Sequence, residues 1–164
     1  RARACVGCGG MGLGGCRVQD EEGLRPVPGT LERGGTRVLD SQTPYSQRSW
    51  RYWTEEGRKE LPLPALAPGE RELGPDGAEY ELRYRLLDVD PLAQLVTSEM
   101  RALMWRDGEL VADELHVLKM VVYFAAEVGL MLEQAGFSDI VARGAYRDEQ
   151  PTRDDQFIVH SARK

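Results

Sequence analysis

Long hydrophobic runs are missing from this chain of 164 residues: nowhere does it reach the ~20 consecutive apolar residues that a membrane-spanning helix needs. We therefore expect no membrane span. Residues 4–15 are rich in glycine and poor in leucine, so the start does not resemble a secretory leader. A basic surplus is missing too. The formal net charge is −6, which argues against a surface built for phosphate backbones, and we expect no nucleic-acid partner.

Cysteine is scarce and confined to the first residues, as Cys5, Cys8 and Cys16. An odd number fits a reducing compartment better than a disulfide framework, so we expect a cytoplasmic protein. Cys5-x-x-Cys8 with Cys16 also has a spacing that can hold zinc. The fourth ligand would have to be His116, His160 or a partner's residue, and nothing in the sequence brings either histidine near. We therefore predict no metal site.

The first 30 residues differ in composition from the rest of the chain. They are dense in glycine, which opposes regular structure, and show neither a helical nor a strand period. We expect an irregular, disordered leader over 1–30 and one folded domain over 31–164, a length sufficient for a real core. The sharp change near residue 31 also raises the hypothesis of a truncated or mistranslated longer gene.

Strand patterns dominate the first part of the domain. Residues 36–40 are β-branched and follow a Gly34-Gly35 turn, whereas the proline-rich residues 61–77 predict an irregular connection. Apolar and charged residues alternate over 80–86, which predicts a strand with one buried and one wet face. Asp107-Gly108 is a strong hairpin signal because both residues tolerate positive φ. It joins predicted strands over 95–105 and 109–119.

A helix pattern follows over 124–135. Val128, Met131, Leu132 and Ala135 recur at the spacing of one helical face, and Gly136 is placed as a left-handed cap. Glu127 is expected to be a solvated residue of this helix. The remaining sequence predicts two strands, over 139–145 and 156–162, joined by a charged loop.

This tail resembles the end of class I methyltransferases, in which a helix ending in Ala-Gly-Phe precedes a strand, a loop and a final strand ending in Ala-Arg-Lys. The matching residues are Tyr123, Glu127, Leu130, Leu132, Ala135, Gly136, Phe137, Ala162, Arg163 and Lys164. Residues 31–40 resemble the family's Leu-x-Pro-Gly-Gly turn into its fifth strand, with Arg33 where proline is usual.

The resemblance implies an α/β fold, α+β as the chain stands: the C-terminal part of a Rossmann-like methyltransferase sheet. It also implies a three-stranded antiparallel lid insertion over about 78–120, S-adenosylmethionine as cofactor, and methyl transfer to a small-molecule nucleophile. Gly7, Gly9 and Gly12 resemble the family's cofactor loop. In the family, however, roughly half a domain separates that loop from the fifth strand, and here Gly12 and Gly34 are only about one βα step apart. We therefore expect the cofactor-binding front half to be missing and activity to be impaired.

Candidate substrate residues follow the presumed fifth strand. Ser41, Thr43 and Tyr45 leave it at the carboxyl end, where open α/β sheets bind ligands, although an ordinary polar loop would look the same. Trp50 and Tyr52 could form an aromatic wall around a cationic or apolar substrate, or anchor the lid to the core.

His116 is the last substrate-side candidate. Glu114 precedes it by two residues, on the same face of a predicted strand, so the pair could share a proton in base chemistry or simply form a surface contact.

A non-catalytic α+β binding or dimerisation domain is the rival interpretation. A sheet that lacks its first strands exposes an apolar edge, and pairing with a second copy would cover it, which predicts a homodimer.

Overall fold

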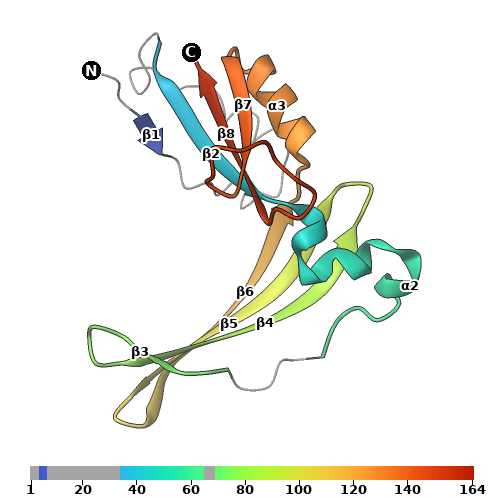
Figure 1. Cartoon of the computed structure of the whole chain (residues 1–164). Coiled ribbons are helices and arrows are strands. Elements are labelled where there is room, and N and C mark those ends of the chain that lie inside the picture. The colour runs from blue at the N-terminus through green and yellow to red at the C-terminus, as the bar shows by residue number, and fades with distance from the viewer. Residues whose placement is uncertain (1–3, 7–33, 65–68) are drawn as a thin grey trace. The chain divides into compact units, whose positions relative to one another are not determined.

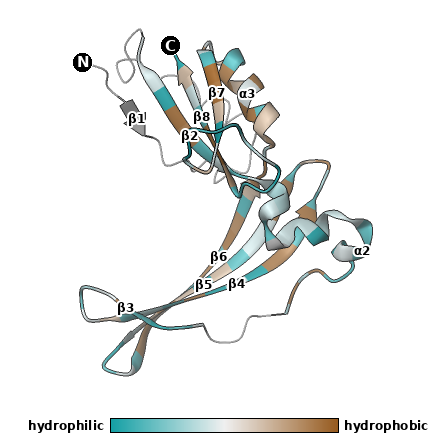
Figure 2. Ribbon diagram, in the orientation of Figure 1, coloured by the Kyte–Doolittle hydropathy of each residue, from teal (hydrophilic) through white to brown (hydrophobic). Residues whose placement is uncertain are grey.

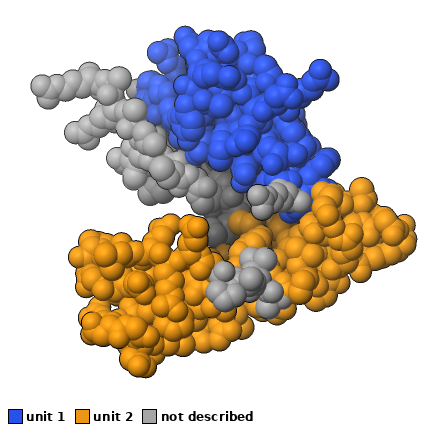
Figure 3. Space-filling model, turned by 60° about the horizontal axis from the view of Figure 1, so that its bottom comes forward, with its two compact units in different colours: residues 1–50, 121–164 blue, residues 51–120 orange. Residues whose placement is uncertain are grey.

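A computed structural model describes residues 4–6, 34–64 and 69–164, and the chain divides into two compact units (Figure 3). Unit 1 comprises Arg1–Trp50 and Val121–Lys164, and unit 2 comprises Arg51–Met120. Together they give a mixed α/β protein with two sheets, one in each unit. No helix in the described ranges is long and apolar enough to cross a membrane.

The sheet of unit 1 has four strands in the order β1-β2-β8-β7 (Figure 1). Their bounds are Ala4–Val6 for β1, Thr36–Gln42 for β2, Phe157–Arg163 for β8 and Ser138–Gly144 for β7. β1 runs parallel to β2, whereas β8 is antiparallel to both of its neighbours. The sheet is therefore mixed, with an antiparallel edge on a parallel pair.

β1 lies inside the stretch 1–30 for which the sequence predicts a loop. Its three residues are extended because they pair with residues 36–38 of β2. Local composition carries no signal for such a pairing, since the partner strand lies about 30 residues further on.

Helix α3 (Ala125–Gln134) packs against β7 and β8. Val128 and Leu132 are fully buried, as the helical period predicts, and Figure 2 shows hydrophobic stretches on strands β2 and β7 of the same unit. The expectation for Glu127 is corrected: its carboxylate accepts the backbone N–H of Phe124 at 2.8 Å. Glu127 thereby satisfies one of the donors that the start of a helix leaves unpaired.

The turn before β2 is hydrogen-bonded to the residue that follows β8. Gly34 has φ +79° and donates its N–H to the carbonyl of Lys164 at 2.7 Å, while the N–H of Lys164 donates to Gly35 at 3.1 Å. The Gly-Gly turn thus starts β2 in register with the last residue of the chain.

The sheet of unit 2 is antiparallel, in the order β3-β4-β5-β6. The bounds are Glu72–Leu73 for β3, Glu79–Asp90 for β4, Leu95–Arg106 for β5 and Glu109–Val121 for β6. All three long strands were predicted, β4 from alternation over 80–86 and β5 and β6 as the strands that flank the Asp107-Gly108 turn. β3, which makes the sheet four-stranded instead of three-stranded, is too short to show a period.

Short helices fill the stretch between β2 and β3, for which the sequence predicts no element. They are the 3-10 helices η1 (Pro44–Ser46) and η2 (Arg48–Trp53) and the α-helix α2 (Glu55–Arg58). The hydroxyl of Thr54 caps α2 by accepting the N–H of Gly57 at 3.1 Å.

The Asp107-Gly108 hairpin is confirmed. Both residues have positive φ, +51° and +83°, as a two-residue turn of the mirror-image type requires.

Two glycines at α3 provide a matched stability test. Gly136 has φ +84° and Gly129 lies inside the helix, and a Cβ added at either would meet no atom within 4 Å. We expect Gly136→Ala to destabilise the protein by about 1 kcal/mol, because alanine disfavours left-handed backbone. Gly129→Ala should stabilise it by about 0.5–1 kcal/mol through helix propensity. Chemical unfolding of both variants measures the two values, and equal effects would contradict the cap assignment.

Candidate functional site

The carboxyl ends of β1 and β2 lie at the same edge of the sheet in unit 1, because the two strands are parallel. Ligands of open α/β sheets bind beyond such an edge. β2 ends here in Ser41 and Gln42, and Thr43 and η1 follow. Ser41 is half-buried and Tyr45, within η1, is exposed. This edge is our candidate site.

Thr43 is held tightly by the fold. Its side chain is only 4% exposed, and its hydroxyl donates to the carbonyl of Asp155 at 2.8 Å. Its backbone N–H donates to the carbonyl of Gln156 at 2.9 Å. The single hydroxyl proton of Thr43 is therefore used to join the end of β2 to the segment that precedes β8.

The loop of residues 145–156 is organised around the buried carboxylate of Asp155. This carboxylate accepts the backbone N–H and the hydroxyl of Thr152 at 2.7 and 3.0 Å, and also pairs with the guanidinium of Arg147. The N–H of Thr152 lowers the pKa of Asp155 against the opposing effect of burial, with its hydroxyl and Arg147 acting in the same direction. Gly144 leaves room for it, since a Cβ there would lie 2.3 Å from the carboxylate.

Tyr146 brings a side chain from this loop to β2. Its hydroxyl donates to the carboxylate of Asp40 at 2.6 Å, while the residue as a whole is 71% exposed. The two residues are far apart in the sequence, and Tyr146 sits in an ordinary charged loop. The hydrogen bond between Tyr146 and Asp40 therefore could not be predicted from the sequence near either residue.

Of the two residues predicted to form an aromatic wall, Trp50 belongs to unit 1. Its ring meets that of Phe124 edge-on, with centroids 6.4 Å apart and planes at 80°, a favoured aromatic geometry. The residue is nonetheless 39% exposed. The ring of Trp50 is thus oriented by Phe124 and is still accessible to a ligand.

Tyr52 and His116 belong to unit 2. Tyr52 is buried, and the guanidinium of Arg51 lies 4.7 Å from the centre of its ring, so this aromatic face is already covered. His116 lies on β6 with its Nε2 3.1 Å from a carboxylate oxygen of Glu114, which confirms the predicted pair. Both side chains of that pair are exposed.

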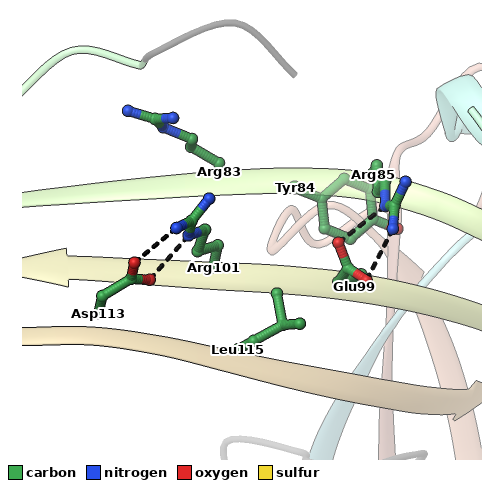
Figure 4. A pocket seen from close by; sticks show the side chains of 7 residues that line it. All are labelled: Arg83, Tyr84, Arg85, Glu99, Arg101, Asp113 and Leu115. Atoms are coloured by element: carbon green, nitrogen blue, oxygen red, sulfur yellow. Dashed lines mark hydrogen bonds and ion pairs between the residues drawn. The ribbon is translucent and has the colours of Figure 1, made fainter. Parts of the chain in front are cut away.

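A groove of about 580 Å³ lies on the sheet of unit 2 (Figure 4). Two arginine–carboxylate pairs line it, each joined by two hydrogen bonds. Arg85 donates to Glu99 at 2.8 and 2.9 Å, and Arg101 donates to Asp113 at 2.7 and 2.5 Å. These donors lower the pKa of both carboxyl groups. The charges neutralise one another, which favours a structural role.

Sequence reasoning missed this groove for a clear reason. Arg85 is visible in the alternation of β4 and Arg101 in β5, but the carboxylate that pairs with each lies on a neighbouring strand. Only the register, which sets Arg85 opposite Glu99, brings them together.

The predicted site residues are therefore divided between the units. Ser41, Thr43, Tyr45 and Trp50 belong to unit 1, and Tyr52 and His116 to unit 2. Gly7, Gly9 and Gly12, like Cys8 and Cys16, lie outside the described residues. Among the residues that are described, no group of three His, Cys, Asp or Glu side chains could hold a metal ion.

Asp155 and its neighbour Asp154 allow a matched test of the loop. At pH 7 we expect Asp155→Asn to lower Tm by about 3–8 °C, because buried donors lose a charged acceptor. Exposed Asp154→Asn should change Tm by less than about 1 °C. The folded-state pKa of Asp155 is lowered, so its stabilisation is present above the ordinary carboxyl pKa and is lost as pH falls below it. Thermal unfolding at pH 7 and pH 3 should show the gap between the variants closing; a constant gap would contradict the assignment.

Solved structures provide the comparison with known proteins. An S-adenosylmethionine-dependent methyltransferase from Clostridium acetobutylicum aligns with a TM-score of 0.67 at 12% sequence identity, covering 98% of this chain and 56% of that protein. The CcbJ methyltransferase from Streptomyces caelestis aligns with a TM-score of 0.60 at 20% identity, with the same two coverages. No protein-family model and no curated protein matches the chain.

The similarity extends along nearly the whole chain, and the chain spans about half the length of the structures that it matches. At these identities the comparison establishes the fold. The chain therefore has a class I methyltransferase fold.

Proposed function

We propose that this chain is part of an enzyme that transfers a methyl group from S-adenosylmethionine to a nitrogen, oxygen or carbon nucleophile of a small molecule. The observation that carries the proposal is the sheet of unit 1, a parallel pair closed by an antiparallel edge, together with its similarity to two methyltransferases. The neighbours favour this interpretation over a non-catalytic α+β domain.

The strand order supports a definite place within that fold. In an open sheet of order 3-2-1-4-5-6, the fourth strand lies beside the fifth and parallel to it. If β2 is the fifth strand, as its Gly-Gly turn predicts, β1 takes the place of the fourth. Gly7, Gly9 and Gly12 then follow the fourth strand in sequence instead of the first. They remain candidates for cofactor contact, since the carboxyl ends of all parallel strands share one edge.

The side chains at the edge fit a substrate better than they fit the cofactor. Binding of ribose hydroxyls is expected from a carboxylate at a strand end, and the carboxylate that β2 offers, Asp40, already accepts the hydroxyl of Tyr146. Ser41, Tyr45 and Trp50 offer two hydroxyls and two accessible aromatic rings. We assign these three residues to the substrate side, where they would orient an acceptor for in-line displacement.

Orientation is the main contribution that such residues can make. When the acceptor is already a good nucleophile, holding it in line with the methyl group supplies much of the rate. Thr43 contributes indirectly, by fixing the edge on which the substrate residues stand. The substrate-binding roles of Tyr52 and His116 stay predictions.

Calorimetric titration with S-adenosylhomocysteine tests the proposal. This product shares the adenosine and the amino-acid part of the donor, so we expect saturable heat with about one site per chain and a Kd below about 1 mM. ATP, which shares only the adenosine, is the control and should bind at least about tenfold more weakly. No heat with S-adenosylhomocysteine at millimolar concentration would contradict cofactor binding by this chain.

A further inference from the structure

β6 is the last strand in the order of the unit 2 sheet, so one side of its backbone pairs with β5 and the other side lies at the edge (Figure 1). It is thirteen residues long, and two apolar residues at its middle are well exposed, Leu115 at 59% and Val117 at 58%. A long edge strand with exposed apolar side chains is a template for pairing with another strand.

Side chains of β6 alternate between the two faces of the sheet. Asp113 and Leu115 point into the groove described above (Figure 4), so Val117 and Lys119 continue the same row. From residue 113 to residue 119 this row reads acidic, apolar, apolar, basic. The charges at its two ends are opposite, and the two residues between them are both apolar. A second copy of the segment, running in the opposite direction, would therefore match it.

Two copies of one edge strand can pair antiparallel about a twofold axis perpendicular to the sheet. In such an isologous contact, if residue i lies opposite residue j, then j also lies opposite i. Opposed side chains must share a face, so i and j must both be odd or both be even. Only a few registers remain, each centred on one residue.

We propose that two copies of this chain pair through β6 in the register centred on His116. That register sets Asp113 opposite Lys119 and Leu115 opposite Val117. By symmetry each pair occurs twice. The interface therefore contains two intermolecular ion pairs flanking two apolar pairs, both of which are favourable cross-strand combinations.

The neighbouring registers do not have this property. Centring the axis on Leu115 places Asp113 opposite Val117 and Val111 opposite Lys119. Centring it on Val117 places Leu115 opposite Lys119 and Asp113 opposite Val121. Within the row that faces the groove, both arrangements set charges against apolar side chains, whereas the register at His116 does not. On the opposite row the His116 register sets Glu114 opposite Leu118, so the selection rests on the groove row alone.

The two charged residues of this register, Asp113 and Lys119, are both exposed. Lys119 is exposed, and no ion pair joins it to any residue of the described ranges. Asp113 is held by Arg101 at the rim of the groove, which fixes the orientation of its carboxylate for a second cation. Charges on an edge strand also serve to prevent pairing. Charges that only prevent pairing, however, need not be opposite in sign at positions equally far from His116.

Charge exchange tests the register. Light scattering on the eluting protein should give twice the chain mass for the unaltered chain at about 100 µM, a concentration well above the Kd of a specific dimer. Lys119→Asp opposes two aspartates at each end of the contact and should raise the dimer dissociation constant at least about tenfold. Glu109→Lys reverses a charge on the same strand outside the paired segment and should leave the dissociation constant unchanged.

Mixing two variants makes the test specific. Asp113→Lys alone should also weaken the dimer, but an equimolar mixture of Asp113→Lys and Lys119→Asp should restore it, because each copy then presents the charge that the other needs. A monomeric unaltered chain, a dimer insensitive to Lys119→Asp, or a mixture that fails to reassociate would each overturn the proposal. Circular dichroism of every variant separates loss of pairing from loss of folding.

Cross-linking gives a second measurement that does not depend on charge. At the axis the two copies of residue 116 lie opposite each other, at a Cα separation of about 4.5–5.5 Å, which is within the range of a disulfide. In a chain whose three native cysteines are replaced by serine, His116→Cys should form a covalent dimer with a mild oxidant. Leu118→Cys, which faces Glu114, should not. Equal cross-linking of both would overturn the register.

Discussion

The placement of β8 is the constraint on which unit 1 depends. The last strand of the chain lies between β2 and β7, antiparallel to both, and buries Ile158 and Ala162 on the face toward α3. His160 is buried in the same row, where its Nε2 lies 3.2 Å from the carbonyl of Ala125 at the start of α3. Burial lowers the pKa of this imidazole, against the opposing effect of the hydrogen bond to that carbonyl. One strand thus fixes the sheet, the helix and the direction of β2, and with them the edge that carries the candidate site.

Local signals explain what could be predicted from the sequence. Three features follow from residues close together in the sequence, and all three were predicted: the Asp107-Gly108 hairpin, the apolar face of α3 and the cap at Gly136. β1 and the contact between Tyr146 and Asp40 could not be predicted. Both are formed by partners distant in sequence, and in each the local residues are compatible with an ordinary loop.

The candidate site shows a related limit. Residue type and position in the chain identified Ser41, Thr43 and Tyr45 equally well, since all three follow the same strand. The structure distinguishes them: the hydroxyl of Thr43 is used by the backbone of the 145–156 loop, whereas Tyr45 remains exposed. A polar residue at a strand end can bind a ligand or hold the next segment in place. Sequence alone does not separate the two, because the competing partner is more than 100 residues away.

The two sheet edges, at β1 and at β6, also differ in a way that the sequence alone does not show. The sequence directs attention to the edge of the parallel sheet, where the family's first strands would continue, as the surface that a second copy would cover. β1 is only three residues long, so an added strand would gain few hydrogen bonds there. β6 offers thirteen residues and a row of side chains that complements itself. Strand length and charge order therefore favour the β6 edge of unit 2 over the β1 edge as the surface for the proposed pairing.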